Sequence, residues 1–483
     1  MNRKAAIVGG GVIGGGWAAR FLLNGWDVSV ADPDPEAARK IDAVLDRARR
    51  MLPMLYERAM PGEGRLTITD DLEGAVDGAA WVQESVPERI EIKRAVFSRI
   101  AAAVAPGVPV GSSTSGYKPS DLAEGLGAPG AQVMVAHPFV PVYLLPLVEV
   151  VGHPGSDPAV LDQAETVLRA IGMAPLRIRA EIDAHVADRF LEGVWREALW
   201  LVRDGIATTE EIDDAIRLGF GLRWAQMGLF ETYRLGGGEG GMAQFVAQFA
   251  PALEWPWSRL TDVPTLDAEL SAKIASQSDA QSGHLDPDQL ARLRDDNLVS
   301  ILRALKARGS AAGAVLATHE ESLPDPATAE QAEGAPLITL ERTVPIDWTD
   351  YNGHMNESRY GQVFSDAADG VMRRIGADAA YIADGLSYFT ADIRIRFLAE
   401  LHAGARIRVE SQVLEGKGKK LRLFHRLLDA EGAEAATAEQ FLLHVSLETR
   451  RSCVPREDVA ARLEALAAAH AQLLAPDPAA RLP

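Results

Sequence analysis

Short apolar runs alternate with longer amphipathic segments through the first 180 residues of the chain. The runs are rich in valine, isoleucine and alanine, and they include AAIVGG, DVSVAD, AAWVQES, VPVGSST, AQVMVAHPF and LVEVVG. Runs of this composition, bounded by glycine or polar residues, favour strands, and the segments between them have the period of helices. Alternating strands and helices are typical of a doubly wound parallel sheet. We therefore predict an α/β domain over residues 1–180.

The pattern changes twice further along the chain. Residues 181–308 have no strand-like runs, and segments such as DRFLEGVWREALWLV and LDPDQLARLRDDNLVSILRALKA predict an all-helical domain. Residues 309–336 are small, acidic and proline-containing, as expected for a linker. Residues 337–483 predict an α+β domain, with a helix over about 360–375, strands in ADIRIRFLAEL, ARIRVESQVLEG, KLRLFHRLLDA and AEQFLLHVSLET, and a closing helix over 456–474.

The composition restricts the partners and the compartment of the protein. A formal net charge of -19 opposes binding to nucleic acid or to an anionic membrane surface. A single cysteine, Cys453, excludes an internal disulfide and fits a reducing cytoplasm. No apolar run is long enough to span a bilayer. We expect a cytoplasmic protein that acts on small molecules, and no metal ion is expected.

A glycine-rich turn follows the first predicted strand and opens the first predicted helix. Gly9, Gly11 and Gly14 satisfy the pattern G-x-G-x-x-G, in which the glycines permit a tight turn and a close approach of the backbone to a pyrophosphate. Val12 and Ile13 lie in the same turn and are expected at the cofactor too. The second strand ends in Asp32, where a carboxylate binds the ribose of NAD and repels the phosphate of NADP. This predicts a Rossmann domain that binds NAD, against the alternative of a turn without a ligand.

His137 and Glu149 are the candidates for the chemistry of alcohol oxidation. Hydride loss from a secondary alcohol requires a base for the hydroxyl proton and a group that orients this base. His137 follows AQVMVA at the predicted carboxyl edge of the sheet, and Glu149 lies in the next run, LVEVV. A carboxylate beside an imidazole fixes its tautomer. A purely structural histidine is the alternative for His137 taken alone.

Two segments, GSSTSG and AHPFVPVYLLPLVEVV, resemble the 3-hydroxyacyl-CoA dehydrogenase family in the same order. The resemblance covers about three-fifths of the chain. It implies that His137 is the general base, that Glu149 is its partner and that Ser115 contacts the substrate oxygen. It also places Lys93 where the family has a lysine that contacts the cofactor, with Glu84 nearby in VQESVPE. A homodimer formed through the helical domain is a further implication.

Two positions depart from the pattern of this family. Val140 replaces the asparagine of H-F-F-N-P, and Asp188 replaces the asparagine of V-N-R. The added carboxylate favours a cationic substrate, and aromatic rings hold quaternary ammonium groups through cation–π attraction. Aromatic residues at helical spacing are also typical of a core or a dimer interface. The candidate aromatic residues for substrate binding are Phe139, next to His137 in the α/β domain, and Phe220 and Trp224 in the helical domain. The helical domain also contains Phe230, Tyr233, Phe245, Phe249, Trp255 and Trp257.

The helical domain carries a narrower resemblance. ADRFLEGVWREALWLV and GFGLRWAQMGLFETYRLGGGEGGMAQF resemble the L-carnitine dehydrogenase branch of the family, which implies NAD-dependent oxidation of L-carnitine to 3-dehydrocarnitine. Because a His–Glu pair serves many substrates, L-gulonate and 3-hydroxybutyryl-CoA stay open as alternatives. Substrate charge separates them, since Asp188 fits a cation and opposes an anion.

A motif in the last third resembles hot-dog thioesterases of the 4-hydroxybenzoyl-CoA type. The stretch VPIDWTDYNGHMNESRY matches W-x-D-x-x-G-H-x-N-x-x-x-Y. The resemblance implies that Asp350 acts as base or nucleophile on an acyl-CoA thioester, and that His354 and Asn356 shape the site. The fusion then predicts hydrolysis of betainyl-CoA to glycine betaine and CoA. An assembly module without chemistry is the alternative, because Asp, Gly and Asn also suit an ordinary loop.

Overall fold

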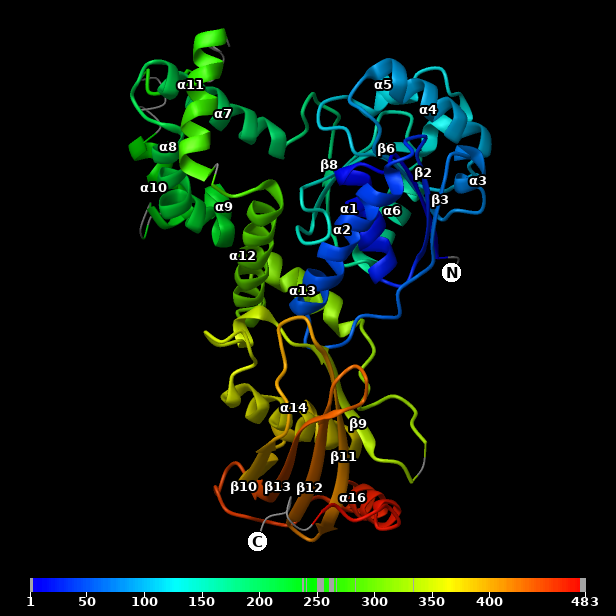
Figure 1. Cartoon of the computed structure of the whole chain (residues 1–483), viewed down its shortest axis with the longest axis vertical. Helices are drawn as coiled ribbons and strands as arrows, with labels where there is room; N and C mark the ends of the chain where they lie inside the picture. Colours follow the sequence, from blue (N-terminus) through cyan, green and yellow to red (C-terminus); the bar gives the residue numbers. More distant parts are fainter. Residues whose placement is uncertain are drawn as a thin grey trace. The chain divides into compact units, whose positions relative to one another are not determined.

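Two compact units make up the chain. The computed structural model describes residues 3–236, 239, 241–249, 256–259, 265, 267–282, 284–332 and 334–477 (Figure 1). One unit comprises residues 1–49 and 62–319, and the other comprises residues 50–61 and 320–483. The predicted linker contains helix α13 (Ala312–Glu321), in which Leu316 and His319 are buried. The first unit therefore includes part of the segment 309–336, which was predicted to be a linker because of its small residues.

An eight-stranded sheet forms the centre of the first unit, in the order β3-β2-β1-β4-β5-β6-β7-β8. Its strands are β1 (Lys4–Val8), β2 (Asp27–Ala31), β3 (Leu66–Thr69), β4 (Trp81–Glu84), β5 (Val110–Ser112), β6 (Val133–Pro138), β7 (Leu147–Val151) and β8 (Ala174–Ile178). The accompanying helices are α1 (Val12–Leu23), α2 (Ala37–Met51), α3 (Leu72–Val76), α4 (Ile90–Ala103), α5 (Pro119–Ala123) and α6 (Pro158–Ala170). All strand pairs from β3 to β6 are parallel, which confirms the predicted doubly wound sheet.

One strand pair runs antiparallel, which the alternation of strands and helices did not predict. β6 and β7 are joined by residues 139–146 alone, and so short a connection cannot make the crossover that parallel neighbours need. The chain therefore turns back, and His137 on β6 is paired directly with Glu149 on β7. The two residues are cross-strand neighbours by register.

The described residues between β8 and α13 are mostly helical, which confirms the predicted helical domain. The helices are α7 (Ala187–Arg203), α8 (Thr209–Ala215), α9 (Gly221–Gly236), α10 (Gly241–Phe249), α11 (Ala268–Ser282) and α12 (Pro287–Ala307), with a π-helical turn, η3 (Ile216–Phe220), between α8 and α9. Two of these helices begin with a capping box. Thr208 forms the one at the start of α8, and Asp286 forms the one at the start of α12.

The second unit packs one long helix against a five-stranded antiparallel sheet, in the order β10-β13-β12-β11-β9. Its elements are β9 (Leu337–Thr343), α14 (Glu357–Ile375), α15 (Ala379–Ala383), β10 (Leu386–Phe397), β11 (Arg406–Lys417), β12 (Lys420–Leu428), β13 (Glu434–Ser446) and α16 (Glu457–His470). Val363, Phe364 and Ala367 of α14 share a buried apolar cluster with Val409 and Leu427 of the sheet. This arrangement confirms the predicted hot-dog fold.

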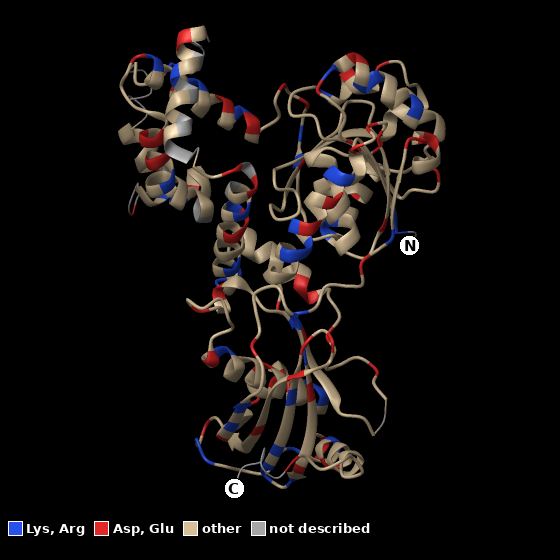
Figure 2. Ribbon diagram, in the orientation of Figure 1, with Lys and Arg blue, Asp and Glu red and all other residues tan. Residues whose placement is uncertain are grey.

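Charged residues of both signs are interspersed over the helices and strands of the two units (Figure 2). The helices in the described ranges of the chain lack the length and apolarity needed to cross a membrane. The second unit also includes residues 50–61, with a short 3-10 turn, η1 (Leu52–Leu55), whose Leu52, Met54 and Leu55 are buried. This excursion of the chain was not predicted from the sequence pattern.

Candidate active site

A cleft of about 930 Å³ lies at the carboxyl ends of β1, β2, β4 and β5. The residues that line it belong to the turns after these strands, and they include Gly9, Gly11, Val12, Ile13 and Asp32. In doubly wound sheets, ligands bind at this edge, and the volume is within the range of cofactor sites. The structure thus gathers the predicted cofactor residues of the first turn and the second strand around one cleft.

The glycines of the first turn fit a dinucleotide for three different steric reasons. Gly9 has a φ of +100°, and a Cβ there would lie 2.6 Å from the carbonyl oxygen of Ser85. A Cβ on Gly14 would lie 1.8 Å from the carbonyl oxygen of Gly9, so only glycine allows α1 to pack this closely. At Gly11 a Cβ would meet no described atom within 4 Å, which leaves this backbone open to a ligand.

Asp32 follows β2 directly and is held in place by backbone groups. Its Oδ2 accepts a hydrogen bond from the Gly10 amide at 2.6 Å, and its Oδ1 accepts one from the Asp34 amide at 2.8 Å. Each oxygen of an ionised carboxylate can accept further hydrogen bonds. Asp32 therefore remains able to accept hydrogen bonds from ribose hydroxyls in the cleft.

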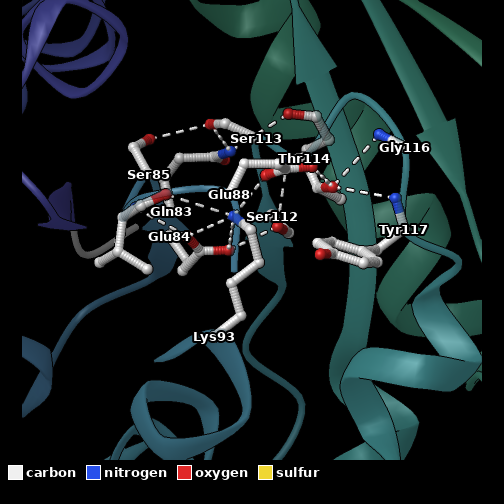
Figure 3. Close-up of polar contacts among 12 residues, drawn as sticks. Gln83, Glu84, Ser85, Glu88, Lys93, Ser112, Ser113, Thr114, Gly116 and Tyr117 are labelled. Carbon is white, nitrogen blue, oxygen red and sulfur yellow. Dashed lines mark hydrogen bonds and ion pairs between the residues drawn. The ribbon is translucent and has the colours of Figure 1, made fainter. Parts of the chain in front are cut away.

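A buried lysine beside the cleft is held by two carboxylates (Figure 3). The Nζ of Lys93 lies 2.9 Å from Oε1 of Glu84 and 3.1 Å from Oε2 of Glu88. Glu88 also accepts a hydrogen bond from Thr114, and Glu84 accepts one from Ser112. Among the described residues, Lys93 and Glu88 line the cleft, whereas Glu84 is fully buried outside its lining. Glu84 therefore holds Lys93 from the buried side of the lysine, away from the cleft. Glu88 is the acidic residue of this pair that lines the cleft.

The loop after β5 is fixed by a buried serine. The Oγ of Ser113 lies 3.2 Å from the indole nitrogen of Trp17, 2.8 Å from the amide nitrogen of Gln83 and 2.9 Å from the Oγ of Ser85. The next serine along, Ser115, is exposed and lines the cleft. The anchored loop therefore presents Ser115, the predicted substrate contact, toward bound molecules.

His137 and Glu149 form a hydrogen-bonded pair at the edge of the sheet. The Nδ1 of His137 lies 3.0 Å from Oε2 of Glu149, which is fully buried. The other oxygen of Glu149 accepts hydrogen bonds from the backbone amides of Val186 and Ala187, both at 2.9 Å. Burial alone raises the pKa of Glu149, but the hydrogen bonds from His137, Ala187 and Val186 outweigh this effect and lower the pKa. Glu149 is therefore ionised, and it links the histidine to the start of α7.

Asp188 faces the other nitrogen of the same histidine. Its Oδ2 lies 3.6 Å from the Nε2 of His137, and its side chain is 18% exposed. Burial raises the pKa of Asp188, while the nearby His137 opposes this effect. The ring of Phe139 packs edge-on against His137, with ring centroids 4.9 Å apart. The predicted residues Asp188 and Phe139 are thus beside the base.

The aromatic residues of the helical domain lie elsewhere in the described part of the unit. Phe220 and Trp224 contact each other, with centroids 4.6 Å apart, and no contact joins them to the His137 cluster among the described residues. Tyr233, Phe245 and Phe249 form a separate stack, whereas Phe230 and Trp257 are largely exposed. Trp255 lies outside the described residues. The described arrangement therefore does not bring Phe220 or Trp224 to the base.

A second cavity, of about 360 Å³, lies in the second unit between the turn before α14 and the end of β10. Asp350, His354 and Tyr360 line it, together with Phe397 and Glu400. Asp350 also holds its own turn, because its Oδ1 accepts a hydrogen bond from the Asn352 amide at 2.8 Å.

Asn356 does not line this cavity, unlike Asp350 and His354. Its side chain caps α14 by accepting a hydrogen bond from the Ser358 amide at 3.0 Å. In the cavity, the Nε2 of His354 lies 3.2 Å from the Oε2 of Glu400. The structure thus brings Asp350 and His354 to one cavity and gives Asn356 a role at the helix start.

Three residues of the first site were missed from the sequence. Glu88 lies five positions before Lys93 in the same segment, and its spacing from this lysine was the available signal. Ser113 and His185 are buried beside the cleft loop and His137. Ser113 lies in the segment GSSTSG, which was the available signal, whereas no local pattern marks His185. Their positions depend on contacts between segments distant in sequence.

Known protein families match three parts of the chain. Residues 4–182 match the NAD binding domain of 3-hydroxyacyl-CoA dehydrogenase, and residues 185–273 match the C-terminal domain of the same family. Residues 344–463 match the thioesterase-like superfamily. The three matches follow one another along the chain in the order of the predicted α/β, helical and α+β domains.

Individual relatives match the first part alone or nearly the whole chain. A Ruegeria pomeroyi protein named L-carnitine dehydrogenase/betainyl-CoA thioesterase is 59% identical over 98% of this chain and 97% of its own length. A Mesorhizobium japonicum protein named L-carnitine dehydrogenase is 51% identical over 66% of this chain and 89% of its own length. The solved structure of 5-formyl-3-hydroxy-2-methylpyridine 4-carboxylic acid 5-dehydrogenase is 29% identical, has a TM-score of 0.56, and covers 63% of this chain and 99% of that one. The chain therefore belongs to the 3-hydroxyacyl-CoA dehydrogenase family, in a branch whose members carry a thioesterase-like domain after the dehydrogenase domains.

Proposed function

We propose that this chain is a bifunctional enzyme that oxidises L-carnitine to 3-dehydrocarnitine with NAD and hydrolyses betainyl-CoA to glycine betaine and CoA. The observation that carries the first activity is the pairing of His137 with Glu149 at the edge of the sheet that also carries the dinucleotide cleft. The Ruegeria pomeroyi relative, which matches nearly the whole chain, is named for both activities. We place the enzyme in the cytoplasm, because its single thiol, Cys453, fits a reducing compartment.

Proton transfer in the dehydrogenase reaction falls to His137. NAD held in the cleft would supply the acceptor for the hydride that leaves the carbinol carbon of the substrate. Because the Nδ1 of His137 is engaged by Glu149, its Nε2 is the atom that accepts the hydroxyl proton. The ionised Glu149 then stabilises the positive charge that develops on the imidazole. Ser115, exposed in the cleft, is placed to donate a hydrogen bond to the substrate oxygen.

The cofactor is held by the residues that line the cleft. Gly9, Gly11 and Gly14 would bring the backbone and the start of α1 to the pyrophosphate, and Asp32 would accept hydrogen bonds from the adenosine ribose. Lys93, oriented by its carboxylate partners, lies on the wall of the same cleft. These groups position the dinucleotide and leave the proton chemistry to His137.

Asp188 supports a cationic substrate. L-Carnitine carries its quaternary ammonium on the carbon next to the carbinol, so a carboxylate near the base is also near this charge. Asp188 lies 3.6 Å from the proton-accepting nitrogen of His137, and Phe139 adds an aromatic ring beside the base. An acyl-CoA or gulonate anion at this position would meet repulsion from Asp188.

Asp350 is the group we assign to thioester hydrolysis. Hydrolysis breaks the C–S bond, adds a hydroxyl to the acyl carbon and returns a proton to the CoA sulfur. Asp350 lines a cavity at the N-terminus of α14, where backbone amides and the helix dipole stabilise negative charge on the thioester oxygen. The carboxylate acts either as the base for water or as the nucleophile.

We also propose a homodimer formed through the helical domain. Phe190, Leu191, Val194 and Trp195 lie on one face of α7 and are 58%, 57%, 37% and 56% exposed. A contiguous apolar face of this kind marks a protein interface. A second copy of the same surface is the partner that the family resemblance implies.

The dehydrogenase activity is tested by the rise in NADH absorbance when purified protein is mixed with NAD at alkaline pH. Alkaline pH favours the neutral imidazole and the release of the product proton. L-Carnitine is expected to be oxidised, whereas D-carnitine, gulonate and 3-hydroxybutyryl-CoA are expected to be inert. Turnover of gulonate or the CoA ester with L-carnitine inert would overturn the proposed substrate.

Asp188→Asn is expected to raise the KM for L-carnitine about tenfold, equivalent to about 1.4 kcal/mol, with the KM for NAD unchanged. Because burial raises the pKa of Asp188, the wild-type carboxylate is lost at a higher pH than an ordinary aspartate. The wild-type KM for L-carnitine should therefore rise as the pH falls, and the variant should lack this rise. Glu210→Gln removes a charge from an exposed residue of the neighbouring helix α8 and serves as the control. Full carnitine affinity in Asp188→Asn would exclude this role.

Asp350→Ala is expected to slow the release of free thiol from betainyl-CoA about 100-fold, because the general base or nucleophile is lost. The control Asp347→Asn changes an exposed aspartate of the preceding turn and should keep the wild-type rate. NAD reduction by L-carnitine should be the same in both variants. Equal thioesterase rates in Asp350→Ala and wild type would favour a hot-dog domain that serves assembly alone.

Trp195→Glu is expected to convert the homodimer into single chains, because a charge on the apolar face of α7 opposes its burial. Sedimentation equilibrium measures the mass directly. Glu192→Gln, on the same helix, should keep the mass of two chains. A wild-type mass of one chain at all concentrations would contradict the proposed assembly.

A further inference from the structure

A strained turn joins β8 to α7 next to the base. Ala184 and His185 are consecutive non-glycine residues with φ values of +59° and +47°. This left-handed region is disfavoured for residues with a Cβ, and it persists only where surrounding contacts hold it. His185 is also fully buried, although it is polar. The contacts that hold this turn therefore indicate which neighbouring groups depend on its conformation.

One side of the turn is bonded to the loop that carries Ser115. The Nε2 of His185 lies 3.1 Å from the carbonyl oxygen of Thr114, so this nitrogen carries the proton and donates. The backbone amide of Ala184 donates to the carbonyl oxygen of Gly116 at 3.3 Å. Two hydrogen bonds, on either side of Ser115, thus fix the loop to the turn.

The other side of the turn is bonded to the catalytic pair. The amides of Val186 and Ala187, which directly follow His185, donate to Glu149. The ring of His185 lies 5.7 Å from that of His137, centroid to centroid. A single turn therefore holds the substrate-contacting loop and the base in one fixed arrangement.

The protonation state of His185 suits this location. Because Nε2 donates to Thr114, Nδ1 is the unprotonated nitrogen, and it has no hydrogen-bond partner among the residues that the structure describes. Burial lowers the pKa of His185, with Thr114 and Glu149 opposing and His137 adding to this effect. A neutral imidazole brings no positive charge to a site that His137, Glu149 and Asp188 share.

We infer that His185 is a positioning residue of the dehydrogenase reaction, which holds the Ser115 loop in register with His137 through the carbonyl of Thr114. The inference rests on the proposed oxidation of a 3-hydroxy substrate. Ser115 and His137 contact the same substrate oxygen in that reaction, so their separation sets the alignment of the carbinol with the cofactor. Loss of the hydrogen bond from His185 to Thr114 therefore frees the loop that carries Ser115, so that the position of Ser115 relative to His137 is no longer fixed.

His185→Phe tests this role, because it keeps a buried ring and removes the donor to Thr114. We expect kcat to fall about 10- to 100-fold, with a larger deuterium isotope effect from substrate labelled at the carbinol carbon. The dissociation constant for NAD should stay within about twofold of wild type, because the glycine turn and Asp32 are untouched. His185→Gln, which retains an N–H donor, is expected to restore most of kcat.

His153→Phe is the matched control. His153 lies in the same unit, and its Nε2 contacts the carbonyl oxygen of Gly130 at 3.0 Å, so the substitution removes the same kind of bond away from the base. It is expected to leave kcat and the isotope effect unchanged. If His185→Phe fails to fold, His185→Asn replaces it, because the shorter amide does not reach Thr114, and the same outcomes are expected.

Unchanged kcat and isotope effect in the His185 variants would overturn the inference and leave His185 as a residue that only fills space. Equal losses in the His153 variant, or a matching loss of NAD affinity, would assign the effect to general destabilisation instead. The measurement uses whichever alcohol the wild-type enzyme oxidises. Inert L-carnitine would therefore overturn the proposed substrate alone, while the His185 variants still decide the positioning role.

Discussion

The hydrogen bond between His137 and Glu149 is the contact on which the dehydrogenase site depends. It exists because β6 and β7 run antiparallel with these two residues in register, so the sheet itself orients His137, the base that we propose. Glu149 uses its second oxygen to bind the first amides of α7. A helix N-terminus favours a negative charge, so the same carboxylate that orients the base also attaches the helical domain. The buried carboxylate of Glu149 therefore both orients His137 and binds the start of the helical domain.

Local sequence patterns predicted the parts of the site that lie on one segment. The glycine turn, Asp32 and the strand-helix alternation are readable because each depends on neighbours along the chain. The pairing of β6 with β7 was readable only from the short connection between them, and its direction was missed. Glu84 illustrates the remaining limit, because its position behind Lys93 depends on burial that spacing does not report.

In the second unit too, features set by neighbours along the chain were predicted, and features set by contacts between distant segments were not. The motif from Asp350 to Tyr360 predicted the turn, the helix and two residues of the cavity, Asp350 and His354, because these lie within one continuous segment. Phe397 and Glu400 complete the lining from a distant segment, and the motif did not predict them. The assignment of residues 50–61 to this unit could not be predicted, since that segment leaves the first unit after α2 and returns before β3. Long-range excursions of this kind leave no periodicity in the sequence, and only packing reveals them.

The two carboxylates around His137 explain why the substrate charge matters. Removing an uncompensated carboxylate from water costs free energy, and the ionic partner of the partly buried Asp188 among the described contacts is His137. We propose that a trimethylammonium group balances Asp188, which leaves Glu149 to stabilise the positive charge that develops on the imidazole during turnover. On this proposal, the replacement of the family asparagine by Asp188 makes a cationic substrate part of the charge balance around His137.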